Sequence, residues 1–214
     1  MTIVLATRNL GKFREMEFLF RTYLPSLKDV TLTPLADFAD APQVAEDGAT
    51  FHENARLKAL EIANFTGCMT IADDSGLEVD ALDGAPGVRS ARYAGEHVTD
   101  DDNVRKLLFA LDGVSFDQRG ARFVCVVAVA LPNDVLGLFE GVCHGVIAEE
   151  PRGGNGFGYD PVFVRTDSGK TFAELPHRVK NRISHRSRAF EKAAATIERY
   201  VARLQDAEQH DVAS

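Results

Sequence analysis

Two adjacent carboxylates, Asp73 and Asp74, stand directly after the apolar run Cys68–Ala72 and before Ser75 and Gly76. Like charges this close raise each other's pKa, so a strand that ends in such a pair benefits from a cation. Mg²⁺ takes carboxylate oxygens as ligands and would supply that charge. The alternative is a plain β-turn, because Asp, Ser and Gly are all common turn residues. A buried strand that runs into paired carboxylates favours the magnesium site over the turn.

A second candidate segment lies between a predicted strand, Ile3–Ala6, and a predicted helix, Phe13–Leu24. Its residues are Thr7, Arg8, Asn9, Leu10, Gly11 and Lys12. Backbone N–H groups and the positive end of a helix dipole favour a phosphate at such a junction, and Lys12 adds a positive charge. The spacing is not that of a Walker A loop. Taken alone, the segment fits an ordinary turn with a solvated lysine equally well.

A third candidate segment surrounds the start of another predicted helix. Thr50 and Glu53 form a capping box that opens this helix. Helical spacing then places Asn54 and Lys58 on one face, and Glu46 precedes the helix within reach of a metal ion. The alternative is an amphipathic helix without a ligand.

A glycine-rich segment and a basic segment complete the candidates. Gly153–Pro161 allows a ligand to approach the backbone closely and offers aromatic rings that can stack on a base. Its candidate residues are Phe157, Gly158, Tyr159 and Asp160. Lys180, His185 and Arg186 stand just ahead of a predicted last helix, Ser187–Gln205. Positive charge is unfavourable at a helix N-terminus, which favours a ligand-facing role over a solvated helix start.

Strand-like and helix-like stretches alternate along the chain, which predicts an α/β fold. Arg122–Leu131 and Val135–Ile147 predict a long antiparallel pair, Asp80–Gly95 predicts a long loop, and Gly67 predicts a left-handed helix end. We expect an elongated, strongly twisted mixed sheet flanked by helices. The chain forms one domain, residues 1–214, with two lobes and an active-site cleft between them. Its polar tail from residue 205 is expected to fray.

The net charge of −8 disfavours a general nucleic-acid binder. It allows a small polyanionic substrate, which needs only a local basic cluster or a metal. The apolar run near the N-terminus is too short for a signal peptide or a membrane helix. Cys68, Cys125 and Cys143 are odd in number and lack CxxC spacing. They predict buried thiols in a reducing, cytoplasmic compartment, with neither a disulfide nor a zinc site.

The motifs TxNxGK, EDGxTFxENAxxK, ADDSGLEVDALxGAPGVxSARYAG, GFGYDPxF and KxxISHR follow one another from Thr7 to Arg186. Together they resemble the inosine triphosphate pyrophosphatase family. Its members hydrolyse purine nucleoside triphosphates such as ITP, dITP and XTP to the monophosphate and pyrophosphate, and so remove them from the nucleotide pool. DDSG alone is a weak signal, whereas all the motifs in family order are specific. Arg8 and Asn155 stand where small residues are common in the family, which leaves only fine specificity open.

The resemblance also implies roles for individual residues. Asp74 would be the general base and, with Glu46, would hold Mg²⁺. Residues 157–160 would line the nucleoside pocket, with Phe157 stacking on the base. The phosphate-binding residues would be Thr7 to Lys12, Lys58 and Ser75. The residues that read the purine edge would be Lys180, His185 and Arg186.

Water attack on the α-phosphorus, with pyrophosphate leaving, is the implied reaction, and a homodimer is the implied assembly. Two alternatives remain at this point. One is a related pyrophosphatase for other modified nucleotides, such as methylated pyrimidines. The other is a nucleotide-binding regulator without turnover. The Asp73–Asp74 pair argues against the regulator, since a pure binder would avoid negative charge beside a triphosphate.

Overall fold

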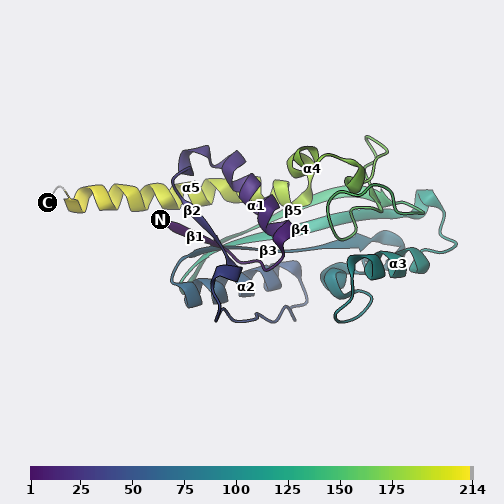
Figure 1. The fold of residues 1–214 in the computed structure, drawn as a ribbon, viewed down its shortest axis with the longest axis horizontal. Helices are drawn as coiled ribbons and strands as arrows, with labels where there is room; N and C mark the ends of the chain where they lie inside the picture. Colours follow the sequence, from purple (N-terminus) through teal and green to yellow (C-terminus); the bar gives the residue numbers. More distant parts are fainter. Residues whose placement is uncertain (213–214) are drawn as a thin grey trace.

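A mixed six-stranded sheet runs along the molecule (Figure 1). The structure, a computed structural model, describes residues 1–212. The strands are β1 (Thr2–Leu5), β2 (Thr31–Pro34), β3 (Met69–Val79), β4 (Gly120–Leu131), β5 (Asp134–Ile147) and β6 (Phe163–Val164). Their order across the sheet is β2-β1-β3-β4-β5-β6. β1 is parallel to β2 and β3, and the other pairs are antiparallel.

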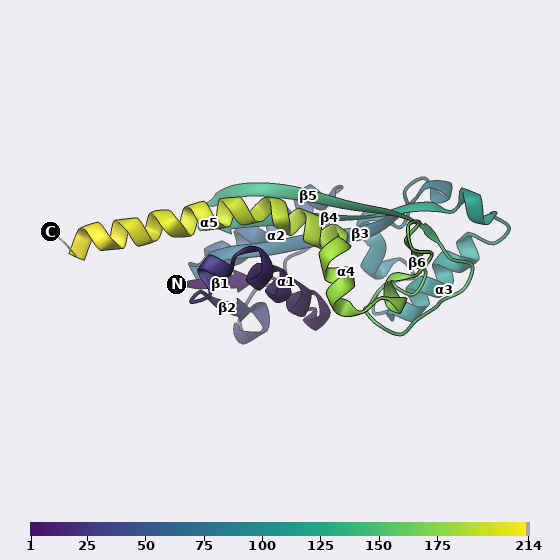
Figure 2. The same cartoon turned by 90° about the horizontal axis from the view of Figure 1, so that it is seen from above.

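Helices cover both faces of this sheet (Figures 1 and 2). They are α1 (Leu10–Tyr23), α2 (Phe51–Thr66), α3 (Asp100–Ala110), α4 (His177–Ile183) and α5 (His185–Val212). α1 and α5 pack together on one face, where the rings of Phe20 and Phe190 lie 6.4 Å apart. α2 packs on the opposite face through small side chains such as Ala55. α3 lies at the other end of the sheet, where Leu107 joins a separate apolar cluster. The predicted α/β fold with an elongated mixed sheet is confirmed.

Local sequence signals fix the ends of α2 as predicted. The Thr50 hydroxyl accepts a hydrogen bond from the backbone N–H of Glu53, and the Glu53 carboxylate accepts one from the N–H of Thr50. Gly67 ends the helix at φ 68°, a conformation that costs a glycine little because it lacks a Cβ. The predicted capping box and helix end are both confirmed.

The end of the strand predicted at Ala72 is wrong. β3 continues from Met69 through Asp73, Asp74 and Ser75 to Val79, and pairs along this length with β4. Turn-forming residues therefore lie within a buried strand, because distant cations balance the charge of Asp73 and hydrogen bonds hold Asp74. This polar stretch separates two apolar parts of β3. One part, ending at Ala72, packs with α1, α2 and α5, and the other, beginning at Leu77, packs with α3.

The C-terminal part of the chain also differs in detail from the prediction. Lys180 lies within the short helix α4, and Arg186 lies in the first turn of α5, which starts at His185. The loop predicted over Asp80–Gly95 contains two short 3₁₀ helices, the second of which is Gly87–Arg92. α5 runs to Val212, beyond the sheet (Figure 2). Fraying of the tail from residue 205 stays a prediction, and residues 213–214 lie outside the described residues.

Two further findings concern the described residues only. All three cysteines are unpaired, with Cys125 and Cys143 buried and Cys68 partly buried. No helix in this part of the chain is long and apolar enough to cross a membrane.

Candidate active site

The candidate residues meet where the short strand β1 stops and its long neighbour β3 continues. Leu5 at the end of β1 pairs with Ile71, so the polar stretch of β3 that follows has no strand on this side. The chain turns there into α1, and Asn9 caps the helix by accepting a hydrogen bond from Lys12 N at 3.1 Å. The Thr7 hydroxyl accepts one from Asn9 N at 3.2 Å. The start of α1 thus lies beside the carboxylates of β3.

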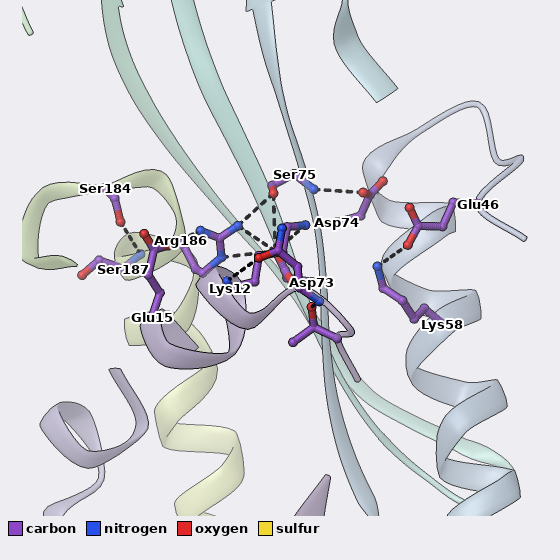
Figure 3. A network of polar contacts seen from close by, with 12 residues as sticks. Lys12, Glu15, Glu46, Lys58, Asp73, Asp74, Ser75, Ser184, Arg186 and Ser187 are labelled. Atoms are coloured by element: carbon purple, nitrogen blue, oxygen red, sulfur yellow. Dashed lines mark hydrogen bonds and ion pairs between the residues drawn. The ribbon is translucent and has the colours of Figure 1, made fainter. Parts of the chain in front are cut away.

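Asp73 and Asp74 point to opposite faces of the sheet, because successive side chains of a strand alternate. Asp73 faces α1 and α5, where it contacts Lys12 and Arg186. Asp74 faces α2, where it contacts Asn54. Figure 3 shows the two carboxylates on the two sides of β3. The two acids are therefore not a pair sharing one site, and each has its own chemistry.

Two cations balance the charge of Asp73. Its Oδ2 lies 3.2 Å from Lys12 Nζ and 2.9 Å from an Arg186 nitrogen, and the side chain is completely buried. Burial by itself would raise the pKa of Asp73, but the charges of Lys12 and Arg186 outweigh it and hold this pKa far below its ordinary range. Asp73 therefore stays ionised and fixes the positions of two cations.

Asp74 has the opposite electrostatics. Its carboxylate accepts hydrogen bonds from Asn54 Nδ2 and from the backbone N–H of Ser75, each 3.0 Å long. Burial raises the pKa of Asp74, and the negative charge of Glu46 raises it further, although Lys12 and Lys58 oppose the shift. A carboxylate in this position gains from a nearby cation and is poised to accept a proton.

Glu46 and Lys58 form an ion pair on the α2 side of the site (Figure 3). Burial alone would lower the pKa of Lys58, but Asp73 and Glu46 raise it above its ordinary value, so this lysine stays charged. The backbone carbonyl of Glu46 accepts a hydrogen bond from an Arg92 nitrogen at 2.9 Å. Among the described residues there is no cluster of three or more His, Cys, Asp or Glu that could hold a metal on its own. Asp74 and Glu46 thus offer two carboxylates and leave other ligand positions to a bound molecule.

Two adjoining cavities open at this site. The larger, about 570 Å³, is rich in cations, and candidate residues lining it are Thr7, Arg8, Asn9, Lys12, Glu46 and Lys58. The smaller, about 110 Å³, is lined by Phe157, Gly158, Tyr159, Asp160, Ser75, Lys180, His185 and Arg186. Asn9, Lys12 and Ala91 line both, so the two form a continuous site. A larger space rich in cations beside a smaller aromatic one suits a phosphate chain next to a base.

Three candidates do not line either cavity. Asp74 is only 5% exposed and lies beneath the surface next to Ser75. The Leu10 side chain is 65% exposed and points away. Gly11 packs against Phe157, and a Cβ at this position would lie 2.9 Å from the aromatic ring. Gly11 thus lets α1 approach the aromatic wall of the smaller cavity.

Ion pairs organise that aromatic wall. Lys180 Nζ lies 2.8 Å from Glu15 and 2.5 Å from Asp160, and it sits 4.6 Å from the centre of the Phe157 ring. Asp160 also accepts a hydrogen bond from the backbone N–H of Phe157 at 2.9 Å. The charged end of Lys180 is therefore engaged by carboxylates. It holds the ring of Phe157 in place.

Arg186 is similarly engaged. Its guanidinium bonds to Asp73, Glu15 and Ser75 and is almost completely buried. His185 differs, because its ring stacks on Phe123 with the ring centres 4.6 Å apart, and its buried Nδ1 has no hydrogen-bond partner among the residues that the structure describes. Burial and the neighbouring cation of Arg186 place the pKa of His185 well below its ordinary value, so the ring is neutral.

Two residues to which the sequence assigned no role at the site hold it together. Glu15 bridges Lys180 and Arg186 from α1, and Asn54 ties Asp74 to the backbone N–H of Gly48. Glu15 lies three residues after Lys12, on the same face of a helix that leads away from a phosphate-type loop. The spacing of three residues from Lys12 is the feature of the sequence that indicates a place for Glu15 at the site. Asn54 was placed on the face of Lys58, but its link to Asp74 depends on tertiary structure.

Comparison with known proteins places these features in a wider group. The model of the Ham1 family matches residues 3–196. A protein of Geobacillus kaustophilus named dITP/XTP pyrophosphatase is 54% identical over 190 residues, covering 89% of this chain and 91% of that protein. One of the same name from Geobacter sulfurreducens is 51% identical, covering 87% and 92%. The solved structure of a HAM1 protein from Coxiella burnetii superimposes with a TM-score of 0.82 at 42% identity, covering 93% and 99%.

Proposed function

The chain belongs to the Ham1 family, and from this premise we propose that it hydrolyses ITP, dITP and XTP to the nucleoside monophosphate and pyrophosphate. The observation that carries the proposal is the continuous pair of cavities, the larger one rich in cations and the smaller one aromatic. The names of the similar dITP/XTP pyrophosphatases support the same substrate class.

In the proposed reaction, water attacks the α-phosphorus and pyrophosphate leaves. Asp74 orients this water and accepts its proton, because burial has already raised the pKa of its carboxyl group. Asp73 is unsuited to that role, since its charge is held by Lys12 and Arg186. Lys12 and the start of α1 hold the phosphates, together with Lys58.

Asp74 and Glu46 are the residues that would hold a divalent cation, and we propose Mg²⁺. Mg²⁺ is commonly bound by one or two carboxylates together with substrate phosphates, which fits the two carboxylates Asp74 and Glu46. The fit also rests on Asp74, whose buried charge is destabilised by Glu46. When bound, the ion would neutralise charge that develops on the phosphates.

The smaller cavity would take the purine. Phe157 supplies a stacking surface, and Gly158, Tyr159 and Asp160 complete the wall. Lys180, His185 and Arg186 were expected to read the purine edge. The donors of Lys180 and Arg186 are engaged by carboxylates, so in our proposal they shape the pocket. His185, whose ring lines this cavity, would donate an N–H to the 6-oxo oxygen.

We further propose that the enzyme works in the cytoplasm as a homodimer without nucleic-acid partners. The unpaired cysteines support the compartment, and the net charge of −8 argues against nucleic acid. The homodimer rests on the family resemblance alone.

The proposed function is tested by measuring kcat/KM for ITP, XTP, GTP and ATP at one Mg²⁺ concentration. We expect ITP and XTP to be preferred strongly over ATP, because a donor that faces the adenine amino group is left unpaired, and such mismatches can cost roughly 10⁴-fold. Equal cleavage of ATP and ITP would refute the substrate assignment. A methylated pyrimidine triphosphate measured in the same panel separates the related pyrophosphatase, which would prefer it to ITP. Binding without turnover would favour the regulator.

A further inference from the structure

The cations around the larger cavity differ in how their charge is neutralised. Lys12 is paired with Asp73, and Lys58 is paired with Glu46. Both lysines therefore already have a carboxylate partner before any phosphate enters. The attraction of these two lysines for a triphosphate is therefore reduced by their carboxylate partners.

Two arginines that line the same cavity have a different environment. Arg8 donates a hydrogen bond to the carbonyl of Ala41, and Arg92 donates one to the carbonyl of Glu46, each 2.9 Å long. Neither guanidinium forms an ion pair with a carboxylate within the described part of the chain. Among the described residues, Arg8 and Arg92 are thus the cations lining this cavity whose charge is not balanced by a carboxylate. Arg8 belongs to the expected phosphate segment, whereas Arg92 has had no role so far.

Arg92 ends the 3₁₀ helix Gly87–Arg92 and reaches the site from a different element than the start of α1. It is half-buried and lines two cavities, the 570 Å³ one and a neighbouring one of about 450 Å³ that Arg89 and Lys106 also line. It does not line the smaller aromatic cavity. Its position therefore suits the phosphate chain and not the base.

The hydrogen bond from Arg92 to the backbone of Glu46 fixes the position of the guanidinium. A guanidinium presents several N–H donors in a fixed fork, and one bond to a carbonyl leaves others for an anion. The same residue therefore anchors the backbone of a candidate metal ligand. A charge held in this way needs little reorganisation when a phosphate binds.

We propose that Arg92 binds the part of the substrate that leaves as pyrophosphate, and that its tether to Glu46 holds it ready to do so. The inference rests on the proposed function, since it concerns the phosphate chain of that substrate. The leaving group carries more negative charge than the α-phosphate. An uncancelled cation therefore contributes most to binding there.

The test compares three substitutions with a matched control. Arg92→Gln removes the charge but keeps a donor for the Glu46 carbonyl, Arg92→Lys keeps the charge, and Arg92→Ala removes both. Arg89→Ala removes a neighbouring arginine of the same 3₁₀ helix that lines the 450 Å³ cavity but not the 570 Å³ one. Thermal unfolding of each variant checks that it folds.

The readouts are the inhibition constants of inorganic pyrophosphate and of IMP against ITP hydrolysis, at fixed Mg²⁺. For Arg92→Gln we expect the constant for pyrophosphate to rise about tenfold or more, as for loss of a charge-assisted hydrogen bond, while that for IMP changes less than about twofold. Arg92→Lys should lie between, and Arg89→Ala should match the unmodified protein. The inference would be overturned if the inhibition constant of pyrophosphate were unchanged in Arg92→Gln and rose only in Arg92→Ala. Arg92 would then serve only to hold the backbone of Glu46.

Calorimetric binding of inorganic pyrophosphate separates this inference from the proposed function. If the unmodified protein fails to cleave ITP, the proposed function fails, but the loss of pyrophosphate binding in Arg92→Gln still tests Arg92. If ITP is cleaved and Arg92→Gln binds pyrophosphate normally, only the inference about Arg92 fails.

Discussion

Replacing Glu15 by Gln tests the buried ion-pair network that supports the pocket. Glu15 is 7% exposed and bridges Lys180 and Arg186. Breaking a buried ion pair by removing one partner costs about 3–5 kcal/mol. Asp73 and Asp160 still pair with the two cations, so we expect the lower end, about 3 kcal/mol. For a chain of this size, each kcal/mol shifts Tm by about 2–4 °C, which gives a fall of roughly 6–12 °C.

The same substitution has a defined pH dependence. Burial alone would raise the pKa of Glu15, but Arg186 and Lys180 bring it below its ordinary value. A lowered folded-state pKa stabilises the protein above the unfolded pKa, and this stability is lost as pH falls through the folded one. The difference in unfolding free energy between the unmodified protein and Glu15→Gln should therefore be largest at neutral pH. It should disappear at pH values below the ordinary pKa range of carboxyl groups.

The assay is thermal and urea unfolding followed by circular dichroism, in parallel with the exposed neighbour Glu17→Gln as a control. The control should change stability by no more than about 0.5 kcal/mol. A Tm for Glu15→Gln within about 2 °C of the unmodified protein would refute the reasoning, because the network would then contribute no more than a surface contact.

Three further predictions concern the proposed catalytic carboxylate, the lysines proposed to bind phosphate, and the thiols. Asp74→Asn should lower kcat by at least ~10²-fold and leave the fold intact, because it removes the base while keeping the shape of the side chain. Near-normal kcat in a folded variant would remove Asp74 from the mechanism. Lys12→Ala and Lys58→Ala should each reduce kcat/KM for ITP by an amount equivalent to roughly 1.5–3 kcal/mol, and unchanged values in both would make them ordinary solvated lysines. Thiol titration of the denatured, unreduced protein should find all three cysteines, whereas a single thiol would reveal a disulfide.

Local signals predicted the elements that carry the site. The capping box at Thr50 and the left-handed Gly67 fixed α2 because both depend on residues a few positions apart. Asn9 and Lys12 likewise lie in the predicted strand–loop–helix junction. The phosphate-type segment and its position at the sheet were therefore accessible from the sequence.

The electrostatic roles of the acids could not be predicted in this way. Asp73 remains within a strand because Lys12 and Arg186 neutralise it, and Arg186 lies 113 residues away in the chain. The alternation that sends Asp73 and Asp74 to opposite faces depends on β3 continuing past Ala72, which turn-forming residues argued against. The ion pairs of Lys180 with Glu15 and Asp160 could not be predicted either, because these residues are far apart in the sequence.

The central claim is that water attacks the α-phosphorus of ITP at the carboxylate Asp74. Hydrolysis of ITP with Mg²⁺ in ¹⁸O-labelled water, followed by mass spectrometry of the products, tests it most directly. We predict IMP carrying one ¹⁸O atom and pyrophosphate without label. Label in the pyrophosphate, or the release of IDP and orthophosphate, would contradict the claim.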